Sequence, residues 1–310
     1  MATKPLRTAV IGVGYLGRFH AQKYAQLPEA DLVAVVDKHR PTAQKIAQEL
    51  NTQALTDYHE LIGKVDAVNI VTPTPFHFPI AKFFLTQGVH VLIEKPITLT
   101  LDEADELITL AKQYQCILQV GHLERFNPAL LELKKHIHQP AWLESRRMAP
   151  FQLRGTDVNI IYDLMIHDLD IILSLIDSPL KKISASGACV FSDALDVAQA
   201  QLIFENGCAA NLTASRIHTH VERSLHVLQK EMSLLLNFQH ATLLIRKKGE
   251  LPLPQHEFSF TNKDTLLAEI SAFLHAINTQ SPPPVTGEEG RRALDIANRI
   301  TLLIEQKEAL

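Results

Sequence analysis

The sequence predicts an α/β protein whose first part forms a doubly wound parallel sheet and whose second part contains a large, mostly antiparallel sheet. Three observations support this fold class. Apolar runs alternate with helical patterns as far as residue 121, which is typical of a parallel sheet flanked by helices. Between residues 183 and 246, strand-like runs follow one another without helical segments, which indicates antiparallel pairing. A glycine-rich motif, GVGYLG, joins the first predicted strand to the first predicted helix.

The composition is that of a folded chain with one large domain or two ordinary ones. The 310 residues are 46% hydrophobic and 21% charged, so the chain can bury a sizeable core. The 30 basic and 34 acidic residues include no long basic run, which argues against general nucleic-acid binding. The three cysteines are widely spaced, and no apolar run is long enough to span a bilayer. We therefore expect a reduced, cytoplasmic location and no membrane partner.

The first domain is expected to cover residues 1–121. The patterns predict strands at 6–11, 32–36, 66–71, 89–93 and 117–120, and helices at 18–27, 41–50, about 76–88 and about 100–114. Pro96 ends the strand at 89–93, because proline cannot donate a ladder hydrogen bond. Thr100-Leu-Asp-Glu103 is a capping box for the next helix. Lys95 is thereby placed at the carboxyl end of a strand, the edge where open α/β sheets bind ligands.

The second domain is expected to cover residues 122–310. The patterns predict helices at 128–138, 160–175, 266–277 and from residue 286 onward, and strands at 142–148 and at several places between 183 and 246. Asn206-Gly207 is a hairpin-turn signal. Thr286-Gly-Glu-Glu289 is a second capping box, at the start of the last helix.

The GVGYLG motif predicts a dinucleotide site, because it lies between a strand and a helix and an acid follows twenty residues after Gly17. Gly12 permits the tight turn, Gly14 lets the backbone approach a pyrophosphate, and Gly17 lets the helix and strand pack closely. Asp37 is expected to accept hydrogen bonds from the adenosine ribose, which favours NAD over NADP. Arg40 follows nearby and can still reach a 2′-phosphate. The alternative is a glycine turn that binds nothing.

A charged cluster at residues 162–170 lies within an apolar stretch of the second domain. Asp163 and His167 are four residues apart and on a helix would share one face. A carboxylate beside an imidazole supports the imidazolium after it takes a proton, as a general base for an alcohol requires. The alternative is that the pair forms only a surface salt bridge or a cap. Asp168 and Asp170 are expected to be structural or solvated.

The remaining histidines do not predict a metal site. His136 and His138 are two residues apart, as are His218 and His220, and each pair can share a face of a strand. No third ligand follows at a spacing that would complete a site. We therefore expect no bound metal.

Five motifs, in order along nearly the whole chain, resemble those of the Gfo/Idh/MocA family of oxidoreductases. They are GVGYLG with Asp37, TPTPFH at residues 72–77, EKP at 94–96, DLMIHDLD at 163–170 and PVTGEEGRRALDIANRI at 284–300. The resemblance implies an N-terminal Rossmann domain and a C-terminal α/β domain with a large, mostly antiparallel sheet. The open face of that sheet commonly forms a dimer in the family, so a homodimer or homotetramer is implied.

The resemblance also implies the cofactor, NAD, and the roles of individual residues. Lys95 would lie near the nicotinamide and the reacting hydroxyl, His167 would be the catalytic base, and Asp163 would be its orienting partner. The cofactor-binding residues implied are Gly12, Gly14, Tyr15, Leu16, Gly17, Asp37, Thr72, Pro73, His77, Glu94 and Lys95.

The segment GHLERFNP at residues 121–128 resembles a particular branch of the family, which oxidises the 3-hydroxyl of UDP-N-acetylglucosamine for amino-sugar and surface-glycan (lipid A) synthesis. The implied partner is a nucleotide sugar. The substrate-binding residues implied are Lys95, His122, Glu124, Arg125, Asn127, Asp163 and His167. Many relatives have glycines just before the DxxxH motif, whereas this chain has NIIY at 159–162, which leaves the sugar open. The alternatives are a dehydrogenase of a free sugar or inositol, an NAD-dependent glycosidase and a non-catalytic dinucleotide sensor.

Overall fold

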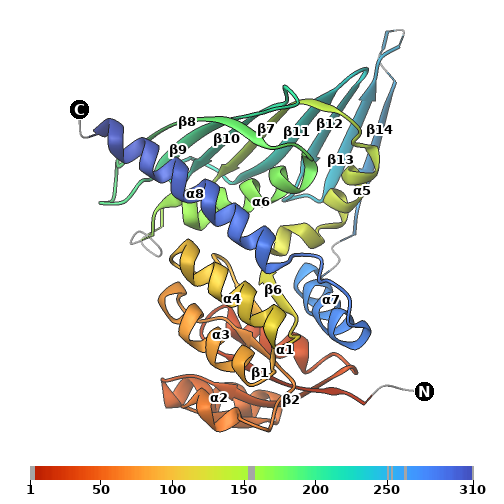
Figure 1. Ribbon diagram of the computed structural model, residues 1–310. Coiled ribbons are helices and arrows are strands. Elements are labelled where there is room, and N and C mark those ends of the chain that lie inside the picture. The colour runs from red at the N-terminus through yellow and green to blue at the C-terminus, as the bar shows by residue number, and fades with distance from the viewer. Residues whose placement is uncertain (1–3, 153–157, 250, 253, 262–263, 309–310) are drawn as a thin grey trace. The chain divides into compact units, whose positions relative to one another are not determined.

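The structure is a computed structural model that describes residues 4–152, 158–249, 251–252, 254–261 and 264–308 (Figure 1). The chain divides into two compact units. Unit 1 comprises Met1–Leu123 and Asp264–Arg291, and unit 2 comprises Glu124–Lys263 and Arg292–Leu310. The sequence did not indicate the return of residues 264–291 to unit 1. The functional division into domains 1–121 and 122–310 stays a prediction.

Unit 1 contains a six-stranded sheet in the order β3-β2-β1-β4-β5-β6, and all neighbouring strands in it are parallel. The strands are β1 Leu6–Ile11, β2 Ala30–Val36, β3 Gln53–Leu55, β4 Ala67–Ile70, β5 His90–Glu94 and β6 Leu118–Gly121. The doubly wound parallel sheet is therefore confirmed. The sequence missed β3, because three residues are too few to show a period.

Helices cover both faces of this sheet (Figure 1). They are α1 Gly17–Tyr24, α2 Arg40–Leu50, α3 His77–Thr86, α4 Leu101–Gln113 and α7 Thr265–Thr279, with 3-10 turns η1 Tyr58–Leu61 and η2 Thr74–Phe76. Side chains of α1, α2 and α7 share one core with Val10 of β1 and Val35 of β2. Helices α3 and α4 pack together on the other face. Because β1 lies between β2 and β4, the winding reverses there, and ligands of such sheets bind at that point.

Unit 2 contains an eight-stranded sheet in the order β14-β13-β12-β11-β7-β10-β9-β8. The strands are β7 Pro140–Met148, β8 Leu180–Ala188, β9 Val197–Phe204, β10 Ala209–Ser215, β11 Glu222–Gln229, β12 Met232–Asn237, β13 Thr242–Lys247 and β14 Gln255–Ser259. The pair β7 and β10 is parallel and the other neighbours are antiparallel. The expected large, mostly antiparallel sheet is confirmed.

One face of the eight-stranded sheet is covered by helices α5 Pro128–His136, α6 Ile166–Leu175 and the unit 2 part of α8 Gly287–Glu308 (Figure 1). Alternate strand residues, such as Leu225, Val227, Leu234 and Leu236, are buried beneath these helices. The side chains between them point to the opposite face, where Leu235 is 41% exposed. This alternation is the expected signature of a sheet with one packed face.

The helix predicted at 160–175 has two parts. A π-helical turn, η4 Ile161–Met165, precedes α6 without a break. Asn159 starts the segment, because its side-chain oxygen accepts a hydrogen bond from the Ile161 N–H at 2.9 Å. Turns of π-helix within α-helices are frequent at functional sites.

Both predicted capping boxes are present. The Thr100 hydroxyl accepts from the Glu103 N–H, and the Glu103 carboxylate accepts from the Thr100 N–H, each at 3.2 Å. Thr286 and Glu289 exchange the same two bonds at the start of α8. Among the described residues, no helix combines the length and the apolar character that crossing a membrane requires.

Candidate functional site

The glycine-rich turn after β1 has the geometry that the sequence motif predicts. Gly12 has a φ of +86°, and a Cβ atom there would lie 2.7 Å from the Val71 carbonyl oxygen. A Cβ on Gly17 would lie 1.8 Å from the carbonyl oxygen of Gly12. At Gly14, by contrast, an added Cβ would meet no atom of the described residues within 4 Å. The turn is therefore closed where α1 packs on β1 and open where a pyrophosphate would approach.

Asp37 lies at the end of β2 and is tied to this turn. Its Oδ2 accepts from the Val13 N–H at 3.1 Å, and its Oδ1 accepts from the His39 N–H at 2.9 Å. Each carboxylate oxygen keeps further lone-pair capacity for a ribose hydroxyl. These two backbone bonds hold the carboxylate beside the Gly12 turn before any cofactor binds.

A cavity of about 240 Å³ adjoins Asp37. It is lined by Ile11, Gly12, Val36, Asp37, Lys38, Thr56, Asp57, Tyr58, Thr72, Pro73, Phe76 and Ile80. Its largely apolar walls with two carboxylates, those of Asp37 and Asp57, suit an adenosine group. The hydroxyl oxygen of Thr72 is buried and has no hydrogen-bond partner among the described residues, as expected for a group that bonds a ligand. Arg40, the residue that could favour NADP, lines a neighbouring hollow instead.

Lys95 follows β5 directly, as the sequence predicts, and is half-buried. The carboxylate of Glu94, the residue before it, accepts from the Lys95 N–H at 3.2 Å and lies 3.3 Å from Nε2 of His20. Burial raises the pKa of Glu94, but the hydrogen bond and charge of His20, with the charge of Lys95, outweigh it and lower the pKa below its usual value. A Cβ on Gly121 would lie 2.9 Å from this carboxylate, so Gly121 leaves room for it.

His77 is the first residue of α3 and is buried. Its Nδ1 lies 2.9 Å from the Pro96 carbonyl oxygen, and its Nε2 lies 2.8 Å from the Thr72 carbonyl oxygen. Burial lowers the pKa of His77, while these carbonyl groups and the charge of Glu94 act in the opposite direction. The imidazole thus connects the turns after β4 and β5. The motif residues Thr72, His77 and Glu94 therefore all lie at the carboxyl ends of those strands.

Asp163 and His167 lie on the continuous helical segment formed by η4 and α6. Both side chains are half-buried, and Nδ1 of His167 is fully buried. His167 belongs to unit 2 and Lys95 to unit 1. The convergence of these side chains on one hydroxyl group stays a prediction.

Asp168 is structural rather than solvated. Arg147 on β7 donates to both of its carboxylate oxygens at 2.9 Å and to Glu124 at 3.0 Å. Burial lowers the pKa of Arg147, but the charges of Asp168 and Glu124 outweigh this effect and raise it. No sequence motif identified Arg147. The one available signal was the alternation of inward and outward side chains along β7, which turns Arg147 toward the core.

The residues expected to bind substrate have varied environments. His122 is buried in unit 1. In unit 2, Arg125 lies 3.3 Å from Asp170 in a buried ion pair, and the Asn127 side chain caps α5 by accepting from the Ala129 N–H. A contact of any of these residues with substrate stays a prediction.

A second group that the sequence did not reveal lies in the core of unit 1. Glu269 of α7 is fully buried, and its carboxylate oxygens have no hydrogen-bond partner among the described residues. The Tyr24 hydroxyl group is also buried without a hydrogen-bond partner among the described residues. Burial, with the negative charge of Glu94, raises the pKa of Glu269 well above its usual value, which favours the neutral form of this acid.

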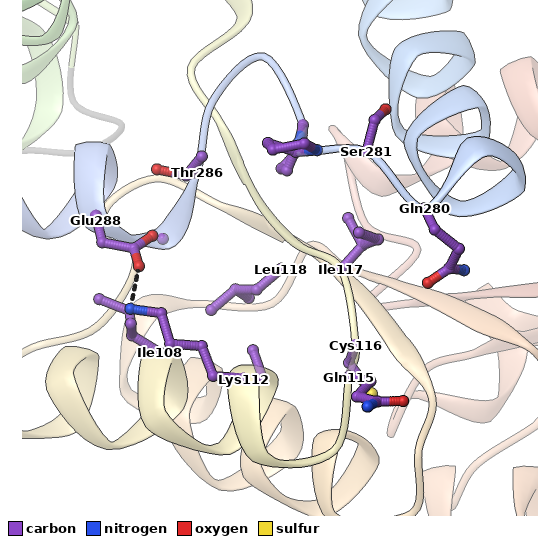
Figure 2. Close-up of a pocket in the computed structure, with 14 residues that line it drawn as sticks. Ile108, Lys112, Gln115, Cys116, Ile117, Leu118, Gln280, Ser281, Thr286 and Glu288 are labelled. Carbon is purple, nitrogen blue, oxygen red and sulfur yellow. Dashed lines mark ion pairs between the residues drawn. The ribbon is translucent and has the colours of Figure 1, made fainter.

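A larger hollow of about 670 Å³ lies at the amino end of β6, between α4 and residues 280–288 of unit 1 (Figure 2). Lys112 and Glu288 form an ion pair across it at 2.7 Å. Burial raises the pKa of Cys116 on its wall to about 11, so this thiol is not activated. Ligands of parallel sheets bind at the carboxyl ends of the strands, which favours the cavity at Asp37.

Comparisons with known proteins agree with this geometry. A family model described as "Oxidoreductase family, NAD-binding Rossmann fold" matches residues 6–122, and one described as "GFO/IDH/MocA C-terminal domain" matches residues 135–234. The chain is 39% identical to the UDP-N-acetylglucosamine 3-dehydrogenase of Acidithiobacillus ferrooxidans over 97% of each chain. A solved structure of that enzyme covers 98% of this chain and 99% of its own, with a TM-score of 0.93 and 38% identity.

A more distant relative acts on a cyclitol. The NAD-dependent scyllo-inositol 2-dehydrogenase of Bacillus subtilis is 28% identical over 94% of this chain and 92% of its own. The similarity in each case spans both units rather than the dinucleotide-binding region alone.

Proposed function

We propose that the chain oxidises the 3-hydroxyl of UDP-N-acetylglucosamine with NAD. The chain belongs to the Gfo/Idh/MocA oxidoreductase family and carries an NAD-binding Rossmann fold. The observation that carries the proposal is 39% identity over nearly the whole length of an enzyme with that activity. The identity to the inositol dehydrogenase is lower, at 28%. The GHLERFNP segment at 121–128, which resembles that branch of the family, supports the same substrate.

Several features of unit 1 fit NAD. Asp37 would accept hydrogen bonds from the adenosine ribose, and a carboxylate there repels the 2′-phosphate of NADP. The open side of the turn at Gly14 would admit the pyrophosphate, and the unpartnered Thr72 hydroxyl would bond the cofactor. When bound, NAD supplies the hydride acceptor.

The chain's own side chains would move the proton and stabilise charge. We assign His167 as the base that takes the proton of the sugar hydroxyl, with Asp163 orienting its ring. Lys95 would stabilise the developing alkoxide by charge and hydrogen bonding. The product would be a 3-keto nucleotide sugar, which an aminotransferase can convert to a 3-amino sugar for surface glycans. We place this chemistry in the cytoplasm.

The test is a panel of hydroxyl substrates, with NADH formation followed by its absorbance. UDP-N-acetylglucosamine should reduce NAD, whereas UDP and free N-acetylglucosamine, supplied separately, should not. The Lys95→Met variant serves as the control for contaminating activity. Reduction of NAD by inositol or glucose, with none by nucleotide sugars, would instead favour a free-sugar or inositol dehydrogenase. Turnover of neither class would favour the glycosidase or the non-catalytic sensor.

A further inference from the structure

Two buried histidines bond the residues on either side of Lys95. His20 of α1 lies 3.3 Å from the carboxylate of Glu94, and His77 of α3 lies 2.9 Å from the carbonyl oxygen of Pro96. We propose that His20 and His77 are positioning residues that together fix the backbone of Lys95. The proposal rests on the role of Lys95 in the proposed function.

The backbone around Lys95 needs such support because the sheet ends there. β5 stops at Glu94, and Pro96 has no N–H to donate to a neighbouring strand. A lysine side chain is long and flexible, so the place of its ammonium group depends on where its backbone is held. A displacement of about 1 Å in a catalytic group can lower a rate by about 10²-fold.

On the first side, a chain of hydrogen bonds leads from β4 to the Lys95 N–H. The Asn69 amide nitrogen donates to the Leu92 carbonyl at 3.2 Å, so its oxygen must face Nδ1 of His20, which lies 2.8 Å away. Nδ1 of His20 is therefore a donor. Its Nε2 faces one oxygen of Glu94, and the other oxygen accepts from the Lys95 N–H at 3.2 Å.

The orientation of Asn69 also defines the charge of this pair. With the Nδ1 proton committed to Asn69, a bond between Nε2 and Glu94 requires one further proton. That proton lies between Nε2 of His20 and the carboxyl group of Glu94, so the pair as a whole has no net charge. Both His20 and Asn69 are buried, at 4% and 0% exposure, so the pair is shielded from solvent and its interaction is strong.

On the second side, His77 holds the residue after Lys95. Its two ring nitrogens face the carbonyl oxygens of Pro96 and Thr72. Carbonyl oxygens only accept, so the neutral imidazole that burial favours donates to one of the two carbonyl groups at a time. His77 thereby connects the Pro96 peptide to the turn after β4. Lys95 is thus held from α1 on one side and from α3 on the other.

The test is a double-mutant cycle with Lys95. His20→Gln and His77→Gln should each lower kcat about 10- to 100-fold. His20→Gln, which alters none of the predicted cofactor-binding residues, should change the dissociation constant for NAD less than about threefold. In a Lys95→Met background, either change should add nothing further, because no ammonium group remains to be misplaced. A general loss of folded protein would instead persist in that background. If Lys95→Met lowers kcat and each histidine variant lowers kcat by the same factor with or without Lys95→Met, the positioning proposal is overturned. The proposed function would still hold in that case.

A second measurement does not need the substrate. Reductive methylation of Lys95, followed by mass spectrometry, should be several-fold faster in both glutamine variants than in the parent, while the exposed Lys64 serves as the internal reference. His90→Gln is the matched control, because His90 begins the same strand and its Nδ1 accepts from the Ile117 N–H at 2.9 Å. That variant should leave kcat and Lys95 methylation unchanged. An unchanged Lys95 methylation rate in both His20→Gln and His77→Gln would also overturn the proposal.

Discussion

Arg147 donates through Nε and Nη2 to the two carboxylate oxygens of Asp168, which is the residue that follows His167 in α6. The third nitrogen, Nη1, donates to Glu124 in the GHLERFNP segment. A second buried pair, Arg125 with Asp170, joins the same two segments. Residues 124–125 and residues 168–170 of unit 2 are therefore bound to each other by ion pairs of two buried arginines. Each of the two segments therefore helps to position the other, in addition to any contact that it makes with substrate.

Removal of Arg147 should destabilise the protein strongly. Arg147→Met leaves the buried Asp168 and the half-buried Glu124 without their cation, and breaking a buried pair such as Arg147 with Asp168 costs about 3–5 kcal/mol. Urea denaturation would measure the loss. The control is Arg146→Ala, because the neighbouring Arg146 pairs with Glu222 at a 44% exposed position, where such pairs contribute about 0–1 kcal/mol. Equal losses in the two variants would contradict the account.

Asp37 should determine the preference for NAD. Asp37→Ala removes two charge-assisted hydrogen bonds to the ribose, each of which contributes about 1.5–3 kcal/mol. The affinity for NAD should fall and that for NADP should rise, because the repulsion of the 2′-phosphate is removed, so the difference between the two affinities should narrow. Fluorescence titration of both cofactors would measure this. Arg40→Ala is the control and should leave the ratio unchanged, since Arg40 lines a different hollow. Tighter binding of NADP than NAD by the parent chain would contradict the assignment.

The fold of unit 1 could be predicted because its signals are local. Each of the five strands predicted from the sequence contains a buried apolar run. The return of α7 could not be predicted in this way, because its partners are distant in sequence: Lys23 binds Asp264 at 2.6 Å, and Glu269 lies in the core beside α1. Strand β14 was missed because it is an exposed edge strand without an apolar face.

The residues of the candidate site were predictable where backbone geometry dictates the residue type. Gly12 and Gly17 are required by close contacts, and the Lys95 position follows from the proline after it. The roles of His20 and Arg147 were not predictable, since each depends on a partner brought near by the fold. Likewise, the sequence does not show which face of the eight-stranded sheet the helices cover; Leu225 and Leu234 lie on the covered face.

The open face of the eight-stranded sheet should form a dimer with two-fold symmetry. Leu235 and Leu244 are paired across β12 and β13 and point to this face. Leu235→Glu should keep the fold, because the residue is exposed in the single chain, but should dissociate the dimer. Light scattering at micromolar concentration would measure the mass. Leu251→Glu is the control, because Leu251 is 86% exposed outside the sheet. A parent chain that already has the mass of one chain would contradict the prediction.

Glu269 should make the stability depend on pH. The folded chain keeps the Glu269 proton, because burial and Glu94 raise its pKa, while the unfolded chain loses it above about pH 4.3. Unfolding therefore releases a proton, and the contribution of Glu269 to stability falls as pH rises, by up to about 1.4 kcal/mol per pH unit. Glu269→Gln removes this pH dependence. The free energy of unfolding of the variant should therefore increase relative to that of the parent chain as pH rises from 4 toward 8.

Urea denaturation of the parent chain and the Glu269→Gln variant at several pH values would measure this difference. Glu257→Gln is the control, since the exposed carboxylate of Glu257 lies on the edge strand β14 and is solvated in both states. A constant difference between the parent and Glu269→Gln across the pH range would show that Glu269 is ionised in the folded chain.

His167 and Asp163 should affect turnover without affecting the cofactor site. His167→Asn removes the proposed base and should lower kcat about 10²- to 10⁴-fold, with NAD affinity unchanged, because the predicted cofactor residues belong to unit 1. The loss should be partly relieved at high pH, where hydroxide can take the proton.

Lys95→Met should lower turnover at every pH, because no solvent species replaces a fixed positive charge. Asp163→Asn should resemble a milder His167 defect, since the imidazole remains but loses its orienting carboxylate. Steady-state kinetics across pH would separate these cases. Near-normal turnover by His167→Asn would transfer the role of base to Lys95, which would then have to lose its proton near neutral pH.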